Sequence, residues 1–345
     1  MNQDNRPTDH PHIAAPRIGV LLINLGTPDA PDASSVRRYL KQFLSDKRVV
    51  EIPQIIWQPI LRGAVLTTRP KKSAHAYSQV WTEDGSPLAA ITKRQAAALQ
   101  ERMGETALVD YAMRYGNPSI ADKLTAMKQA GCERILLAPL YPQYCAATTA
   151  TALDEAFAVL AKMRWQPAVR SLPPYYEDAA YISALAASLE SSLAQLDFTP
   201  DVIIASFHGM PERTLHLGDP YHCHCLKTAR LLSEALGKEL MPTFQSRFGK
   251  AKWLEPYTDA TLERLARQGR HKVAIVAPGF SADCLETLEE LAIRGREQFM
   301  AAGGTHFAYL PCLNDSAPGI TMLDAIISRE LAGWTDTPTP TPIHT

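Results

Sequence analysis

The chain has 345 residues, of which 46% are hydrophobic and 21% charged, a balance typical of a globular protein long enough for two domains. Its formal net charge of −1 provides no bulk attraction for a polyanion, which argues against nucleic acid as a partner. The sequence predicts no membrane-spanning helix, because it contains no uninterrupted apolar run of about 18 residues.

The two ends of the chain differ from the rest in composition. Residues 1–16 are polar and proline-containing and have no apolar signal core, and residues 335–345 alternate threonine with proline. We expect both segments to be disordered tails. With no secretory signal in residues 1–16, we expect the six cysteines to be reduced and the protein to be cytoplasmic.

Two pairs of apolar strands follow the same plan in the two halves of the chain. Residues 17–28 and 202–211 each form an apolar run that ends in Gly-x-Pro. Residues 134–149 and 272–287 each form an apolar run that ends in Ala-Pro, with a cysteine a few positions later. The ordered repeat predicts an α/β protein with two similar Rossmann-like domains, each a doubly wound parallel sheet.

The domain boundaries follow from this repeat. We expect an N-terminal Rossmann-like domain over residues 17–165, completed by a C-terminal helix at residues 317–333, and a second one over residues 166–312. The first half is longer and contains an extra segment that includes residues 40–68, which are apolar with few charges. Two interpretations are open: a helix of the domain core, or an apolar lip over a cleft that would accept a flat ligand or a membrane surface.

His208 is the first residue with clear chemical potential. It follows a short buried strand at residues 202–205, and Gly209 breaks that strand immediately afterwards. Ligands of open α/β sheets bind beyond the carboxyl ends of the strands. An imidazole titrates near neutral pH, so a histidine there is suited to accept protons. The alternative is a hydrogen-bonded loop histidine without a chemical role.

Three carboxylates follow the last strand of the repeat. Asp283, Glu286 and Glu290 are three and four positions apart, so on an α-helix they would share one face. They are either a solvated surface near a helix N-terminus or an acidic track that moves protons or holds a divalent cation. His208 and Glu286 leave the same end of one predicted sheet, so they can face each other across a cleft.

A series of motifs in the chain resembles those of the ferrochelatase family in its bacterial form. In order, they are residues 23–28 (INLGTP), 114–116 (RYG), 140–144 (LYPQY), 206–211 (SFHGMP), 218–221 (GDPY), 245–249 (QSRFG), 253–254 (WL) and 279–288 (GFSADCLETL). The resemblance extends over residues 18–327. It implies two Rossmann-like domains and insertion of Fe²⁺ into protoporphyrin IX to form protoheme, the last step of heme biosynthesis.

The resemblance also implies roles for individual residues. His208 and Glu286 match the essential histidine and glutamate of the family, described as its metal site, and Asp283 and Glu290 match its acidic path. The positions that match residues around the porphyrin are Arg114, Tyr115, Leu25, Phe43 and Trp253. His208 would act as a base toward the pyrrole protons or as a metal ligand, and both roles are open.

The chemistry of the reaction agrees with these roles. A porphyrin must lose its two N–H protons and admit a dication at its centre, and bending the macrocycle exposes its nitrogen lone pairs. A neutral His208 would accept the protons, and Glu286 would pass protons or metal along. The alternatives are a related chelatase for another metal or tetrapyrrole and a non-catalytic carrier of metal or tetrapyrrole.

A histidine- and cysteine-rich motif lies at residues 222–225. Some ferrochelatases hold a [2Fe–2S] cluster on four cysteines, and here such a cluster or a zinc ion would use Cys223, Cys225 and Cys145. The alternative is a solvated turn that leads into a helix at residues 226–236. In that case the protein needs no cofactor beyond its substrate Fe²⁺.

Overall fold

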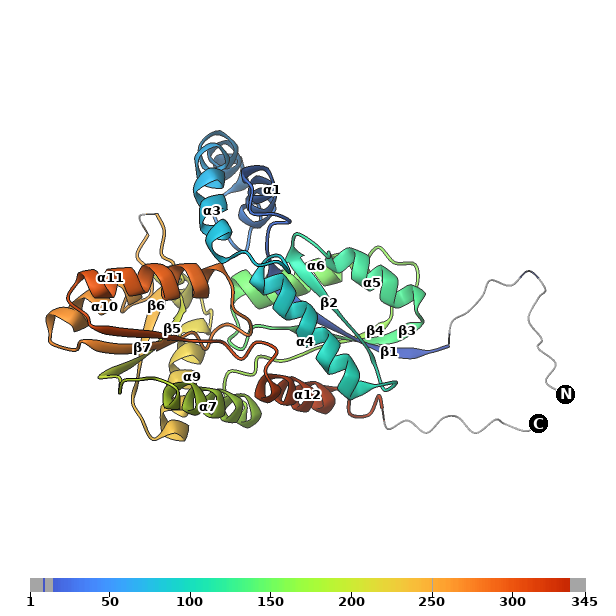
Figure 1. The fold of residues 1–345 in the computed structure, drawn as a ribbon. Helices are drawn as coiled ribbons and strands as arrows, with labels where there is room; N and C mark the ends of the chain where they lie inside the picture. The colour runs from blue at the N-terminus through green and yellow to red at the C-terminus, as the bar shows by residue number, and fades with distance from the viewer. Residues whose placement is uncertain (1–8, 10–14, 250, 336–345) are drawn as a thin grey trace.

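The computed structural model describes residue 9 and residues 15–249 and 251–335. These residues form two four-stranded sheets flanked by helices, with a group of helices that stands beyond both sheets (Figure 1). The tails predicted for residues 1–16 and 335–345 lie almost entirely outside the described residues.

The first sheet is parallel and has the strand order β2-β1-β3-β4. Its strands are β1 (Arg17–Gly26), β2 (Leu108–Tyr115), β3 (Cys132–Pro139) and β4 (Ala168–Ser171). Both faces of β1 are buried, because Val20 and Leu22 enter one hydrophobic core while Leu21 and Ile23 enter another. A strand covered on both sides explains the continuous apolar run in the sequence.

The second sheet repeats the first. It is parallel, has the order β6-β5-β7-β8, and is built from β5 (Val202–His208), β6 (Leu240–Gln245), β7 (Lys272–Val276) and β8 (His306–Leu310). Each half therefore places its first strand in the same position of the same strand order. This confirms the predicted α/β class with two similar Rossmann-like halves.

Helices connect the strands and cover the sheets. Those of the first half are α1 (Ala33–Leu44), α2 (Gln54–Ile60), α3 (Leu66–Val80), α4 (Pro87–Met103), α5 (Ile120–Gln129) and α6 (Thr151–Leu160), with π-helical turns η1 (Leu61–Val65) and η2 (Ala146–Ala150). Those of the second half are α7 (Ala179–Ala194), α8 (Glu212–His216), α9 (Tyr221–Leu236), α10 (Thr258–Arg267), η3 (Glu286–Gly295) and α11 (Arg296–Ala301). A last helix, α12 (Ala317–Leu331), follows β8.

The two halves share one hydrophobic core. The largest cluster of buried apolar side chains contains Leu22 from β1 and Phe207 from β5, together with residues of α7, α9 and α12. Helix α12 packs against both α4 and α7, and in Figure 1 it lies beneath the junction of the halves. The assignment of this helix to the N-terminal domain alone, and the boundary at residues 165 and 166, remain predictions.

Residues 33–80 form a lip segment made of α1, α2, η1 and α3, of which α1 and α3 stand at the top of Figure 1. The segment has a small core of its own, in which Leu44, Val50, Leu61 and Leu66 are buried together. It therefore packs as a separate layer rather than as a helix of the core between the sheets. Its outer surface carries exposed isoleucines, and Ile55 is 86% exposed.

The two Gly-x-Pro sequences of the repeat have a common steric reason. A Cβ atom added to Gly26 would lie 1.7 Å from the carbonyl oxygen of Tyr115, and one added to Gly209 would lie 2.5 Å from that of Gln245. In both halves the chain thus leaves its strand by crossing directly over the backbone of the neighbouring strand. Only glycine allows so close an approach.

We predict that Gly209→Ala destabilises the protein by about 1–3 kcal/mol, because the new methyl group meets a backbone oxygen that cannot move aside. Gly63→Ala is the matched control, since a Cβ atom there meets nothing within 4 Å. The urea midpoints of the two variants and the wild type, compared by circular dichroism, measure the effect. Equal midpoints for both variants would contradict the prediction.

Candidate active site

The strand pairing of the second sheet brings His208 and Glu286 to the same edge. His208 is the last residue of β5, and Glu286 is the first residue of η3, which follows the neighbouring strand β7. Glu290 lies one turn further along η3 and experiences the charges of both His208 and Glu286. The structure therefore gathers three of the predicted residues at the carboxyl end of this sheet.

The imidazole of His208 has a defined tautomer. Its Nδ1 lies 2.7 Å from the carbonyl oxygen of Gly209. A carbonyl oxygen can only accept a hydrogen bond, so in the neutral ring Nδ1 carries the proton and Nε2 keeps its lone pair. Nε2 is thus the nitrogen that can accept a proton or bind a metal ion.

Glu290 is partly buried in a polar pocket. Burial raises the pKa of Glu290, while hydrogen bonds from Ser246 and the charge of His208 act in the opposite direction. Both the backbone N and the Oγ of Ser246 donate to its carboxylate, at 2.8 and 2.6 Å. A carboxylate whose pKa is raised above its usual value is better able to accept a proton near neutral pH.

Asp283 has different surroundings. Its carboxylate accepts hydrogen bonds from Thr287, from the Tyr309 hydroxyl at 2.5 Å and from the Asn314 amide at 2.6 Å. These contacts tie the loop before η3 to the segments around β8. Its role in a proton or metal path remains a prediction.

The expectation that the three carboxylates share one face of an α-helix is wrong. Asp283 precedes the helix, and residues 286–295 form a π-helix with its wider turn. Four residues make slightly less than one turn of such a helix, so Glu286 and Glu290 still lie on nearly the same side. Gln245 supports the start of the helix by donating to the Glu286 carbonyl oxygen at 2.9 Å.

Two tyrosines of the lip segment, which the sequence did not single out, lie near Glu286. Burial raises the pKa of Tyr39 and of Tyr77 well above the usual range, and the negative charge of Glu286 raises both further. Tyr39 stacks on Phe43 with ring centroids 5.9 Å apart. Its position four residues before Phe43, on the same face of the helix, was the one available signal.

Three of the residues matched to the porphyrin site lie at or beside β2. Phe43 packs edge-on against Tyr115, with 5.1 Å between the ring centroids. The Arg114 guanidinium lies over the Tyr115 ring, 4.5 Å from its centroid. Arg114 and Tyr115 both donate hydrogen bonds to Asp46, a residue that the sequence did not indicate. Leu25, at the end of β1, packs with the loop that contains Cys284, two residues before Glu286.

Trp253 supports the loop that carries the histidine. It is 5% exposed, its indole N–H donates to the Phe248 carbonyl oxygen at 3.0 Å, and its ring lies against Gly209. These contacts place Trp253 behind His208 as packing. Direct contact with a porphyrin remains a prediction.

The interpretation of residues 222–225 as a solvated turn is wrong, because helix α9 already begins at Tyr221. Cys223 is exposed while Cys225 is fully buried, since residues two apart on a helix point to different sides. Cys145 is buried as well. Within residues 9, 15–249 and 251–335, no group of three or more histidine, cysteine, aspartate or glutamate side chains is arranged to hold a metal ion.

The fold is similar to that of solved chelatases. SirB from Bacillus subtilis with Fe³⁺ superposes with a TM-score of 0.55 at 13% identity, over 92% of this chain and 97% of that one. The sirohydrochlorin chelatase SirB in complex with cobalt gives a TM-score of 0.52 at 10% identity, over the same shares. Likeness at these identities concerns the fold alone. By its fold, the chain is therefore similar to chelatases built of two Rossmann-like halves.

Comparison of sequences gives the family. A family model described as Ferrochelatase matches residues 17–331. The ferrochelatase of Rhizobium meliloti is 54% identical over 334 residues, which cover 95% of this chain and 98% of that protein. The ferrochelatase of Agrobacterium fabrum is 53% identical over 337 residues, or 95% and 97%. The chain belongs to the ferrochelatase family, whose members are metal chelatases.

His224 joins the two halves and is expected to make their contact sensitive to pH. Its Nδ1 accepts a hydrogen bond from the Tyr144 backbone N at 3.2 Å, and its ring stacks on Tyr176 at 3.6 Å. Burial lowers the pKa of His224 below its usual value. The unfolded chain therefore binds a proton more readily, so the stability from this contact is present above about pH 6.5 and is lost as the pH falls below it.

We predict that His224→Asn reduces this pH dependence, because the amide oxygen can accept the same backbone N–H without binding a proton. The measurement is the urea midpoint of wild type and variant between pH 7.5 and 5.5. The wild-type midpoint should fall more steeply. Parallel curves would contradict the assignment of the proton to His224.

Proposed function

We propose that His208 is the base that removes the pyrrole protons when this enzyme inserts Fe²⁺ into protoporphyrin IX to form protoheme. The observation that carries the proposal is the hydrogen bond from Nδ1 of His208 to the Gly209 carbonyl oxygen, which leaves Nε2 with a free lone pair. A base with one fixed tautomer needs no rearrangement before it accepts a proton.

Glu286 and Glu290 complete the proton route. Each pyrrole N–H that transfers its proton to Nε2 leaves its bonding electron pair on the porphyrin nitrogen and creates an imidazolium ion. The nearby charge of Glu290 stabilises this cation, and Glu286 lies beside Glu290 on η3. The raised pKa of Glu290 suits it to accept the proton from His208. Fe²⁺ would enter the site along the same carboxylates in the opposite direction. Asp283 is proposed as the structural anchor at the end of this path.

The walls around these groups suit a flat apolar ligand. Tyr39 and Tyr77 are buried and uncharged at neutral pH, as tyrosines ordinarily are, and burial raises their pKa values further. We propose that Leu25 and Phe43 contact the macrocycle from the first half of the chain, whereas the fully buried Tyr115 supports Phe43 from behind rather than contacting the porphyrin as the sequence suggested. Trp253 contributes by holding the loop of His208. A hydrophobic cleft with few polar groups is the usual form of a cofactor-sized site.

The test is anaerobic insertion of Fe²⁺ into protoporphyrin IX, followed by loss of porphyrin fluorescence and gain of heme absorption. We expect His208→Ala to reduce kcat by at least about 100-fold while the dissociation constant for the porphyrin changes less than about threefold. His216→Ala, an exposed histidine at the end of α8, is the control and should retain full turnover.

The possible outcomes separate the candidate functions. Tight porphyrin binding by the wild type without turnover would favour a carrier, and turnover only with Co²⁺ or Ni²⁺ would favour a chelatase for another metal. Preserved turnover in His208→Ala would remove this residue from the mechanism. Glu286→Gln, which keeps the side-chain size, should also lower kcat.

We further propose that the lip segment contacts a membrane surface, which would make the enzyme a cytoplasmic protein with peripheral membrane association. Among the described residues no helix is both long and apolar enough to cross a bilayer. Four isoleucines on and beside α2 are nevertheless exposed: Ile52, Ile55, Ile56 and Ile60. Exposed lysines and arginines follow at residues 62–72. Apolar side chains next to cations fit an anionic lipid surface.

We predict that Ile55→Glu combined with Ile56→Glu lowers sedimentation with vesicles of phosphatidylcholine and phosphatidylglycerol by at least about fivefold, because each change removes apolar burial and adds charge repulsion. Phe157→Glu, which alters an exposed apolar residue of α6, is the control. Equal sedimentation of the double variant and the control would contradict a lip-mediated contact.

A further inference from the structure

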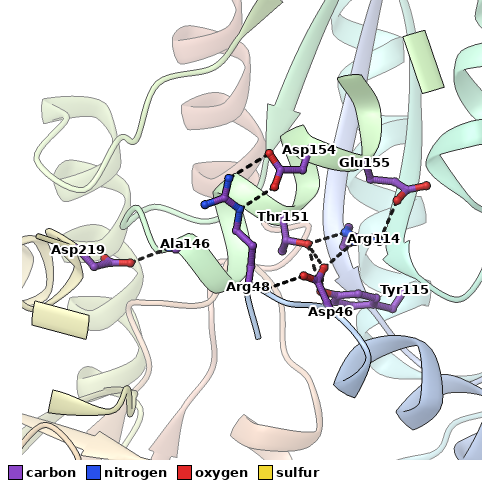
Figure 2. A network of polar contacts seen from close by, with 9 residues as sticks. All are labelled: Asp46, Arg48, Arg114, Tyr115, Ala146, Thr151, Asp154, Glu155 and Asp219. Carbon is purple, nitrogen blue, oxygen red and sulfur yellow. Dashed lines mark hydrogen bonds and ion pairs between the residues drawn. The ribbon is translucent and has the colours of Figure 1, made fainter. Parts of the chain in front are cut away.

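Asp46 lies just beyond the end of α1 and accepts hydrogen bonds from three side chains of the first half (Figure 2). The donors are Arg114 Nη2 at 2.6 Å, the Tyr115 hydroxyl at 2.9 Å and the Thr151 hydroxyl. Arg114 and Tyr115 end β2, and Thr151 begins α6. One carboxylate of the lip segment is thus hydrogen-bonded to both β2 and α6.

The guanidinium of Arg114 is fully engaged within the protein. Besides the bond to Asp46, its Nε donates to Thr151 Oγ1 at 2.8 Å and its Nη1 lies 3.4 Å from Glu155. Its side chain is only 11% exposed. All three nitrogens therefore have protein partners, so Arg114 is arranged to hold structure rather than to bind a ligand directly.

The same bonds fix the orientation of α1. Next to Asp46, the Gln42 side chain accepts from the Gly116 backbone N at 2.9 Å, and the Phe43 ring packs against Tyr115. Further back on α1, Val36 packs in one cluster with Tyr77 of α3 and with Leu285, the residue before Glu286. A shift at the end of α1 would therefore move the wall that faces the catalytic glutamate.

A cavity lies on the outer side of the contact between Asp46 and Arg114. It has a volume of about 430 Å³ and is lined by polar side chains of α1 together with Glu155. The hydrogen bonds of Asp46 are charge-assisted, and together with the packing of Phe43 on Tyr115 they position the end of the helix against β2.

We propose that Asp46 is a positioning residue for the porphyrin: through Arg114 and Tyr115 it holds the lip segment at the separation from Glu286 that the macrocycle requires. This inference rests on the proposed function. It assigns Arg114 a supporting role and gives the substrate-binding wall an electrostatic anchor that is largely buried, unlike the exposed ion pair of Arg48 with Asp154. Removing the charge would leave the buried guanidinium paired only with Glu155 and would loosen the wall.

The experiment compares Asp46→Asn, Thr151→Val and Asp154→Asn. The first keeps the side-chain shape and removes the charge, the second removes one donor to Asp46, and the third alters only the exposed ion pair with Arg48. Steady-state turnover of Fe²⁺ and protoporphyrin IX gives KM and kcat, and fluorescence quenching gives the dissociation constant of the porphyrin. Thermal unfolding verifies that each variant is folded.

For Asp46→Asn we expect KM and the dissociation constant to rise about tenfold while kcat changes less than about threefold, because the binding wall is altered and the proton acceptor is not. Thr151→Val should give a smaller rise of the same kind, and Asp154→Asn should match the wild type. Arg114→Gln should also raise KM, and combining it with Asp46→Asn should add little, since both remove one contact.

Unchanged porphyrin binding in Asp46→Asn would overturn the proposal, as would a fall in kcat at constant KM. If Asp46→Asn does not fold, an unchanged dissociation constant in Thr151→Val overturns it instead. A wild type that binds porphyrin without turnover would reject the proposed function, whereas the role of Asp46 is decided by the dissociation constants alone.

Discussion

The parallel pairing of β5 with β7 and with β6 is the constraint on which the site depends. Parallel strands end at the same edge of a sheet, so the ends of β5 and β7 bring His208 and Glu286 together. The end of β6 adds Gln245 and Ser246, which bond to the Glu286 backbone and the Glu290 carboxylate. Three adjacent strands thus bring His208, Glu286 and Glu290 and the side chains that support them to one edge of the sheet.

The two halves of the repeat contribute different kinds of side chain to the candidate site. The second half contributes His208, Glu286 and Glu290. The first half contributes apolar and aromatic side chains from β1, β2 and the lip segment. Burial raises the pKa of groups in both sets. Tyr39 and Tyr77, which are uncharged at neutral pH in any case, become still harder to ionise, whereas Glu290 becomes better able to accept a proton. The shared core around α7, α9 and α12 keeps both halves in register.

Features set by local chemistry could be predicted from the sequence. Continuous apolar runs predicted the strands. The close approach of Gly26 and Gly209 to a neighbouring backbone requires glycine at both positions, and the resulting Gly-x-Pro sequences revealed the repeat. The start of α9 and the π-helical form of residues 286–295 could not be read, because polar residues at a helix start resemble a turn and a π-helix has no distinct pattern of its own. Asp46 was missed because its partners are 68, 69 and 105 positions away.

The sequence by itself determined the α/β repeat, the position of His208 at a strand end and of Glu286 in the segment after β7, and the family to which the motifs belong. These depend on residue types and short spacings, which the chain displays directly. Only the tertiary structure decided which nitrogen of His208 is open, which carboxylates lie beside it and that Arg114 is held by Asp46. The His208 contact joins neighbouring residues but needs the folded geometry of the strand end, and the other two properties arise from interactions between segments far apart in the chain, which no local pattern encodes.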